Sequence, residues 1–431
     1  MRVLRPKSPD RDLQFAELTA PSSLLDPQIE SRTREIVEAV RIRGDAAILE
    51  LTHRFDGAVM TSDQLAVTTS ELMHASLQAD VELRRSVEDA HSNIAEFARN
   101  SLRKSWQMRN AHGGLVGEKF DPFQRVGIYI PGGTAPLVST ALMTITLAKI
   151  AGCPEIVVCT PAQSTGNANA ALIYAARFAG ATEIYKVGGA QAIAAMAYGT
   201  NTIRPVSKIF GPGNAYVVAA KRLVYGQVAI DLLPGPSEVC ILADESAESA
   251  WIAADILAQA EHGSGHERVW LVTPSARLLK AVEKQIERRL KTLARRESIE
   301  KVLHENGWLI QLKTIEEAIA LVNRLAPEHC EVMTENASRV AAGIVTAGAI
   351  FIGGYSPTVV GDYVAGPSHT LPTGGAARSF GGLTVDQFQR RTSIVEYSRT
   401  ALKKARASIA HFAALEGLDA HGASATVRLD G

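Results

Sequence analysis

The sequence predicts an α/β protein with two parallel-sheet domains and smaller helical regions at both ends. From residue 125 onward, short β-branched runs alternate with alanine-rich amphipathic stretches at the spacing of a strand–helix unit, and most runs end in a glycine-rich turn. We expect a helical region over 1–110, a first α/β domain over 111–236, a second over 237–382 and a helical tail over 383–431.

Composition excludes several classes of protein. The 431 residues include 45 Lys+Arg and 45 Asp+Glu, so the chain has no net field to attract nucleic acid or an anionic membrane. With 46% apolar and 21% charged residues, the composition is globular and not that of a disordered chain. The sequence has neither a signal-like start nor an apolar run long enough to span a bilayer, so we expect a cytoplasmic protein. The cysteines form no Cys-x-x-Cys pair and are expected to be packed as small apolar residues.

The N-terminal region carries helix signals and no cluster of chemical residues. Asp26 before Pro27 is an N-cap with proline at the first helical position, and Gly44 supplies a stop. A second long helical pattern covers 70–102. We interpret the region as scaffold or dimer surface.

The first α/β domain contains five strand candidates. They cover 126–130, 155–159, 183–187, 208–210 and 228–233, and glycine turns follow at Gly132-Gly133, Gly188-Gly189 and Gly211-Pro212-Gly213. Their spacing predicts a parallel, doubly wound sheet, which binds ligands at the carboxyl ends of its strands. Because the sequence lacks G-x-G-x-x-G, the turns alone leave dinucleotide binding open.

The second domain and the tail follow the same pattern less regularly. Strand candidates cover 269–272, 308–311 and 349–353, and helix candidates cover 247–262, 275–293 and 315–325. The tail from residue 385 has the pattern of a helix with a strongly charged start. We interpret those charges as a solvated helix face, because no aromatic residues interleave with them.

A metal site is indicated by Gln259 and His262, which can project from one helix face. Gly263 ends that helix, so His266 is discounted as an i, i+4 partner. A closed zinc site needs four ligands and a substrate-binding site at least three. Asp362 and His421 are candidate distant contributors, although each, taken alone, is more typical of a cap or a surface residue than of a ligand.

Glu328 and His329 are adjacent groups that could act as separate bases, because their ordinary pKa values differ. Taken alone, the pair is also compatible with a helix-end histidine beside a solvated glutamate. His369 lies in a loop bounded by proline and glycine, which can hold a polar residue rigidly for binding.

An ordered set of short segments carries a family resemblance. They are Ile130-Pro131-Gly132-Gly133, Val187-Gly188-Gly189-Ala190-Gln191-Ala192, Phe210-Gly211-Pro212-Gly213-Asn214, Gly235-Pro236-Ser237-Glu238, Gln259-Ala260-Glu261-His262, Ala326-Pro327-Glu328-His329, Gly361-Asp362-Tyr363 and His369-Thr370-Leu371-Pro372-Thr373. Each segment is weak alone. Together, from about residue 33 to 429, the chain resembles the histidinol dehydrogenase family.

The resemblance implies an NAD-dependent homodimer that oxidises L-histidinol through L-histidinal to L-histidine, with one zinc ion per site. It also implies incomplete Rossmann-like domains that lack the usual fingerprint. The implied zinc ligands are Gln259, His262, Asp362 and His421, and the implied catalytic bases are Glu328 and His329. Implied NAD contacts are Tyr129, Gln191 and Asn214; implied substrate contacts are Ser237, His369 and Glu416, together with the zinc ligands and His329. The tail is implied to cross to the partner, so that His421 and Glu416 complete its site.

Two alternatives remain at this point. A paralogue could keep the zinc and base residues while oxidising another small alcohol such as sulfopropanediol. A non-catalytic ligand-binding homologue could keep only the fold. Ser368, where many family members carry Asn, leaves every implied ligand and base intact.

Overall fold

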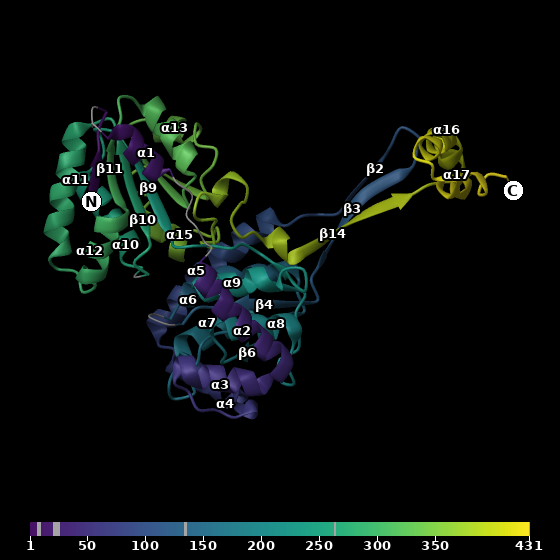
Figure 1. The fold of residues 1–431 in the computed structure, drawn as a ribbon, viewed down its shortest axis with the longest axis horizontal. Coiled ribbons are helices and arrows are strands. Elements are labelled where there is room, and N and C mark those ends of the chain that lie inside the picture. Colours follow the sequence, from purple (N-terminus) through teal and green to yellow (C-terminus); the bar gives the residue numbers. More distant parts are fainter. Residues whose placement is uncertain (7–9, 20–25, 133–135, 263, 431) are drawn as a thin grey trace.

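The computed structural model describes residues 1–6, 10–19, 26–132, 136–262 and 264–430. Two α/β domains lie against each other, and a long arm projects from them and ends in two helices (Figure 1). Gly133, which we assigned to a turn, and Gly263, which we predicted to end a helix, lie outside the described residues. The α/β fold with two parallel sheets is confirmed.

The first domain is built on a parallel five-stranded sheet in the order β6-β5-β4-β7-β8. Its strands are β4 (Arg125–Tyr129), β5 (Glu155–Cys159), β6 (Glu183–Tyr185), β7 (Lys208–Phe210) and β8 (Ala229–Ile230), in the five places predicted. The strand order reverses between β4 and β7, and this is the point where doubly wound sheets bind ligands.

Helices cover both faces of this sheet. One face packs against α6 (Val138–Ala151) and α7 (Ala170–Ala179), with α4 (Thr69–Gln78) and α5 (Val81–Ser101) behind them. The other packs against α8 (Gly189–Tyr198) and α9 (Ala215–Val224), with α2 (Pro27–Arg43) and α3 (Asp45–Asp56) behind. The N-terminal helices therefore form an outer layer of the first domain.

Helix boundaries follow local capping chemistry. The Asp26 carboxylate accepts the backbone N–H groups of Gln28 and Ile29, and Gly44 ends α2, as predicted. The single helix predicted over 70–102 was wrong: the Asp80 carboxylate caps a new helix at the Leu83 N–H, so the pattern divides into α4 and α5.

The second domain has a parallel six-stranded sheet in the order β1-β11-β10-β9-β12-β13. Its strands are β1 (Arg2–Leu4), β9 (Glu238–Ala243), β10 (Arg268–Thr273), β11 (Gly307–Gln311), β12 (His329–Met333) and β13 (Ala349–Ile352). If β1 is left aside, the five remaining strands are arranged in the same sequential order as those of the first sheet, with the first strand of each domain in the centre. Strands β10, β11 and β13 were predicted, whereas the central pair β9 and β12 was missed.

Helices of the second domain also pack on both faces of its sheet. The cluster beneath α10 (Ser249–Ala260) includes α11 (Ala276–Leu290) and α12 (Arg296–Asn306), and the opposite face carries α1 (Arg11–Leu18), α13 (Ile315–Leu325) and α14 (Ala337–Ala341). The short helix α15 (Thr358–Tyr363) follows β13. All four cysteines are buried and free, as predicted.

The arm is an antiparallel sheet in the order β14-β3-β2 that carries α16 (Arg399–Leu415) and α17 (Asp419–Thr426) at its far end (Figure 1). Its strands are β2 (Trp106–Arg109), β3 (Leu115–Pro122) and β14 (Gln389–Glu396), so the predicted helical tail begins with a strand. Phe388 at its root stacks on Phe210 of the first sheet at 3.8 Å. Within the described residues, no helix combines the length and apolarity needed to cross a membrane.

Candidate active site

The backbone of Glu238, at the start of β9, holds both candidate bases. Its N–H donates to Glu328 Oε2 at 2.8 Å, and its carbonyl accepts from His329 Nδ1 at 2.9 Å. The ladder between β9 and β12 begins only with Val239 opposite His329. The Glu238 N–H lies before the first residue pair of that ladder and is satisfied by the Glu328 carboxylate, and its carbonyl also holds the His329 side chain, so both side chains are fixed at the amino-terminal edge of the sheet.

Burial sets the protonation of the two bases. Burial raises the pKa of Glu328 well above its usual range, and the nearby carboxylates of Glu238 and Asp362 raise it further. Burial lowers the pKa of His329, so the neutral imidazole is favoured. Because a carbonyl only accepts, the Glu238 bond places the proton on Nδ1 and leaves the Nε2 lone pair free. The alternative of a solvated glutamate beside a helix-end histidine was wrong, because Glu328 is 5% exposed and His329 begins β12.

Three of the implied ligands lie at the same edge of the sheet. Asp362 Oδ1 on α15 is 3.9 Å from His329 Nε2. His262 lies near enough to oppose the charging of His329 and His369, and so lowers the pKa of both. Gln259 is buried at the end of α10. A helix between parallel strands runs opposite to them, so the end of α10 lies at the edge where β9 and β12 begin.

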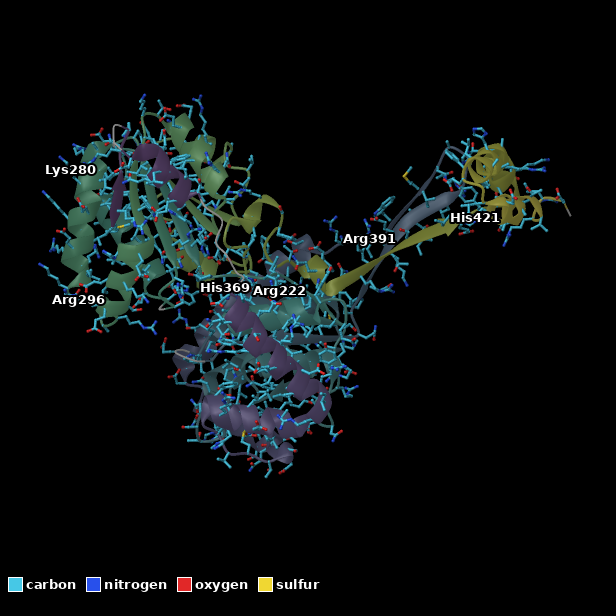
Figure 2. The ribbon with its side chains drawn as sticks, viewed as in Figure 1. Arg222, Lys280, Arg296, His369, Arg391 and His421 are labelled. Atoms are coloured by element: carbon cyan, nitrogen blue, oxygen red, sulfur yellow. The ribbon has the colours of Figure 1, made fainter. Side chains whose placement is uncertain are left out.

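His369 joins this edge to the first domain. Its Nδ1 donates to the Asp362 carbonyl at 2.9 Å, and its Nε2 lies 3.1 Å from the hydroxyl of Thr140 on α6. Figure 2 shows His369 where the two domains meet. A cavity of about 370 Å³ beside it is lined in part by His329, Phe351 and Gly361. Ser237 lies close enough to Glu328 to favour its charged form, which offsets part of the effect of burial on the pKa of Glu328.

The donors on this chain fit part of a zinc site. The Gln259 side chain is buried and its Nε2 has no hydrogen-bond partner among the described residues, so the opposite amide orientation would present Oε1, a lone-pair donor, at that position. Amide oxygen, imidazole and carboxylate donors suit zinc. Among the described residues, no group of three or more His, Cys, Asp and Glu side chains could hold a metal ion. A single chain thus brings together fewer than four ligands.

His421 and Glu416 are not brought to this site. Glu416 caps the end of α16 and His421 lies in α17, both exposed at the tip of the arm. Figure 2 shows His421 far from His369, on the opposite side of the arm's sheet from the two domains. On its own chain, the antiparallel sheet carries both residues away from the other implied ligands.

The three implied NAD contacts line one cavity of about 950 Å³ at the carboxyl edge of the first sheet. Tyr129 ends β4 and its hydroxyl accepts the Gly189 N–H at 3.0 Å. Gln191 is buried in the first turn of α8, and Asn214 caps α9 through the N–H groups of Tyr216 and Val217. A cavity of this size with helix N-termini at its wall suits a dinucleotide with its phosphates.

A buried ion pair fixes the loop that carries Asn214. Gly211 adopts φ +109°, and a Cβ there would lie 2.1 Å from the Tyr129 carbonyl oxygen, so only glycine fits. Its N–H donates to Asp231 at 2.8 Å and its carbonyl accepts from Lys221 at 3.0 Å. Lys221 and Asp231 also pair with each other, with both side chains fully buried.

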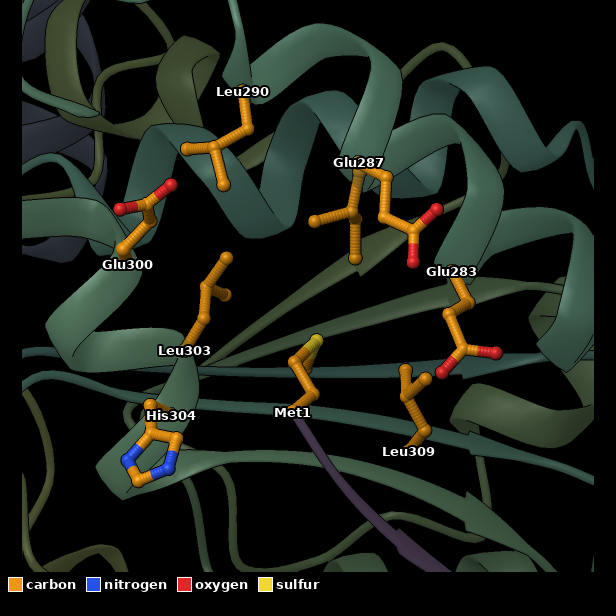
Figure 3. Close-up of a pocket in the computed structure, with 9 residues that line it drawn as sticks. Met1, Glu283, Glu287, Leu290, Glu300, Leu303, His304 and Leu309 are labelled. Atoms are coloured by element: carbon orange, nitrogen blue, oxygen red, sulfur yellow. The ribbon is translucent and has the colours of Figure 1, made fainter. Parts of the chain in front are cut away.

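A smaller hollow of about 200 Å³ lies on the outer side of the second domain (Figure 3). It is lined by Met1, leucines, glutamates and His304 from α11, α12 and β11. None of the predicted site residues lines it, so it is not part of the candidate active site.

Sequence reasoning missed the roles of several residues. Glu238 stands in a motif that we quoted, but a backbone role has no side-chain signature. Thr140 and Asp231 are single polar residues with no motif. Thr140 is one of three threonines in the largely apolar helix α6, so the sequence contains no signal that singles it out.

Comparisons of the sequence and of the structure with known proteins identify the same family. The family model described as histidinol dehydrogenase matches residues 21–429. A histidinol dehydrogenase of Geobacillus kaustophilus is 48% identical, covering 93% of this chain and 96% of the relative. One from Heliobacterium mobile is 44% identical, covering 95% of each. The crystal structure of histidinol dehydrogenase from Elizabethkingia anophelis matches with a TM-score of 0.94 and 35% identity, over 100% of this chain and 98% of that one.

The Lys221–Asp231 pair yields a stability prediction. Asp231→Asn keeps an acceptor for Gly211 but leaves a buried ammonium without its counter-charge, so we expect a loss of about 3–5 kcal/mol in the free energy of unfolding. The double variant Lys221→Met/Asp231→Asn removes the buried charge and should recover much of that loss. Urea unfolding measures both, and a double variant as unstable as the single one would contradict this role for the pair.

Asp56 yields a pH prediction. It lines the large cavity, its Oδ2 is buried with no hydrogen-bond partner in the described part of the chain, and burial raises its pKa to about 6. A carboxyl with a raised folded-state pKa contributes stability below its unfolded pKa, and that stability is lost as pH rises through about 6. Asp56→Asn should therefore gain about 1–2 kcal/mol at pH 8, after allowance for its partial exposure, and nothing at pH 4. An equal gain at both pH values in urea unfolding would show that ionisation is not the cause.

Proposed function

The chain belongs to the histidinol dehydrogenase family, and on that premise we propose how its residues share the work of the reaction. The reaction is the NAD-dependent, four-electron oxidation of L-histidinol through L-histidinal to L-histidine, which ends histidine biosynthesis. The observation that carries the proposal is the pair of buried bases held by the backbone of Glu238.

We propose that Gln259, His262 and Asp362 of one chain and His421 of its partner hold one zinc ion. When bound, zinc would hold the amine and imidazole of the substrate and keep the aldehyde in place between the two oxidations. Support comes from the unpartnered buried amide of Gln259 and from the proximity of Asp362 and His262 to His329.

In the first oxidation, His329 is the base. Its Nε2 carries a lone pair and lies 3.9 Å from Asp362 Oδ1. This nitrogen can accept the hydroxyl proton of histidinol while a hydride leaves the carbon that bears the hydroxyl and passes to NAD. The lowered pKa keeps the imidazole neutral and ready to accept that proton near neutral pH. The product of this step is the aldehyde, L-histidinal.

In the second oxidation, Glu328 is the base. Its raised pKa makes its carboxylate a stronger base than an exposed one, so it can take a proton from water as the water oxygen adds to the aldehyde carbon. The adduct is anionic at the former aldehyde oxygen because Glu328 has taken the proton of the water; it loses a second hydride to a second NAD, and its one remaining hydroxyl proton passes to a base, which leaves the carboxylate of L-histidine. Two NADH form for each histidinol.

We propose a homodimer in which each arm completes the partner's site. The tip of the arm exposes Phe412, Leu415 and Leu418 around Glu416, with exposed fractions of 63%, 69% and 39%. Near the site, the edge strand β13 and the segment after it expose a second apolar surface that includes Ile352 at 46% and Tyr355 at 89%. Apolar surfaces of this kind on both elements support their mutual burial between two chains. Glu416 would then meet a cationic substrate, which favours histidinol over a sulfonated alcohol.

The test of the proposed function is NADH formation from a panel of alcohols that includes histidinol and sulfopropanediol, with and without a chelator. We expect two NADH per histidinol consumed, preference for histidinol over the diol, and loss of activity on zinc removal that zinc restores. A clear preference for the diol would favour the paralogue. Absence of NADH from every alcohol with zinc present would favour a non-catalytic homologue.

The shared site predicts complementation between inactive chains. His421→Ala removes a ligand from the arm, and His329→Ala removes a base from the body. In a mixed dimer one of the two sites receives both intact residues, so mixing the two inactive proteins should restore up to about a quarter of the parent activity at equal ratios. Native mass spectrometry establishes that subunits exchange. Exchange without any recovery would argue against a crossing arm.

A further inference from the structure

Two carboxyl groups that the reaction does not use are buried together between α10 and β12. Asp255 is 8% exposed and Glu331 is 1% exposed, and their side chains lie within hydrogen-bonding reach. Glu331 Oε2 is buried and no N–H or O–H of the described residues donates to it. Burial raises the pKa of both carboxyls, that of Glu331 well above its usual range, and each lies close enough to affect the other, so a protonated Glu331 can donate to Asp255.

The pair lies one structural repeat away from the candidate site. On β12, His329 and Glu331 point to the same face, where Met333 packs with α10. Gln259 lies one turn beyond Asp255, about 6 Å along the helix, and His329 lies two residues before Glu331, about 6.6 Å along the strand. Because α10 and β12 run in opposite directions, these two displacements point the same way. Contact between Asp255 and Glu331 therefore places Gln259 beside His329.

Glu331 also holds the helix that carries Asp362. Its Oε1 accepts the N–H of Thr358, the first residue of α15, at 2.8 Å. Asp362 lies one turn beyond Thr358 on the same short helix. The buried side chain of Glu331 therefore connects α10, β12 and α15. Each of these elements carries one residue of the candidate site close to that connection: Gln259, His329 and Asp362.

We propose that the Asp255–Glu331 pair is a positioning device that fixes Gln259 and Asp362 relative to His329, and so preorganises the metal site. This inference rests on the proposed zinc site for its consequence. A purely stabilising role would not need the carboxyls, because an apolar pair of similar volume is often equally stable in a core. The hydrogen bonds of Glu331 instead fix the orientation of the elements that carry the proposed ligands, and metal ligands need a fixed orientation.

The test compares three variants with the parent. Glu331→Met keeps the volume and removes both hydrogen bonds. Glu331→Gln keeps them, because its amide donates to Asp255 and its oxygen accepts from Thr358. Val332→Ala is the matched control: Val332 is buried on the opposite face of β12, so its truncation destabilises the core without touching α10. The readouts are zinc affinity by chelator competition and amide hydrogen exchange of α15 in the metal-free proteins.

We expect Glu331→Met to bind zinc at least tenfold more weakly and to exchange faster throughout α15. Glu331→Gln should stay within about threefold of the parent, and Val332→Ala should bind zinc as the parent does despite a lower unfolding free energy. Parent-like affinity and exchange in Glu331→Met, or equal zinc loss in Val332→Ala, would overturn the positioning role. If the parent bound no zinc, the proposed zinc site would fall, and the exchange of α15 would still decide whether Glu331 positions that helix.

Discussion

The backbone of one residue, Glu238, is the constraint on which the candidate site depends. Its N–H lies before the ladder with β12 and is satisfied by the Glu328 side chain, and its carbonyl also accepts from the His329 ring. These contacts set the imidazole tautomer and hold both side chains in the interior, where burial raises the pKa of Glu328 and lowers that of His329. The start of β9 thus holds two side chains, Glu328 and His329, that could act as different bases in one site.

The two domains contribute opposite edges of similar sheets. The cavity lined by the proposed NAD contacts occupies the carboxyl edge of the first sheet, as the general rule for doubly wound sheets predicts, whereas the two proposed bases occupy the amino edge of the second. The contact between His369 and Thr140 is one place where these edges meet. Rigid elements hold both edges: a buried ion pair fixes the Gly211 loop, and a buried carboxyl pair connects the helices that carry Gln259 and Asp362.

Much of this fold could be predicted from the sequence, because periodicity and turn residues are local signals. All five strands of the first sheet and the start of α2 were predicted correctly. Strand β9 was missed because it directly follows a proline–glycine motif that was interpreted as a turn, and β12 because Glu328 and His329 resembled a helix end. The arm strand β14 is rich in charge and exposed, and its pairing with β3 is a long-range contact with no local pattern. Within the site, side-chain types were readable from the sequence, but backbone roles such as that of Glu238 were not.

The proposed site is built from two chains, since the arm carries His421 away from the body to which Gln259, His262 and Asp362 belong. The most direct test is a crystal structure of the zinc-loaded protein with anomalous scattering measured at the zinc edge. We expect one zinc per site, bound by those three residues of one chain and by His421 of the partner subunit. Zinc bound entirely by residues of one chain, or bound away from His329, would contradict it.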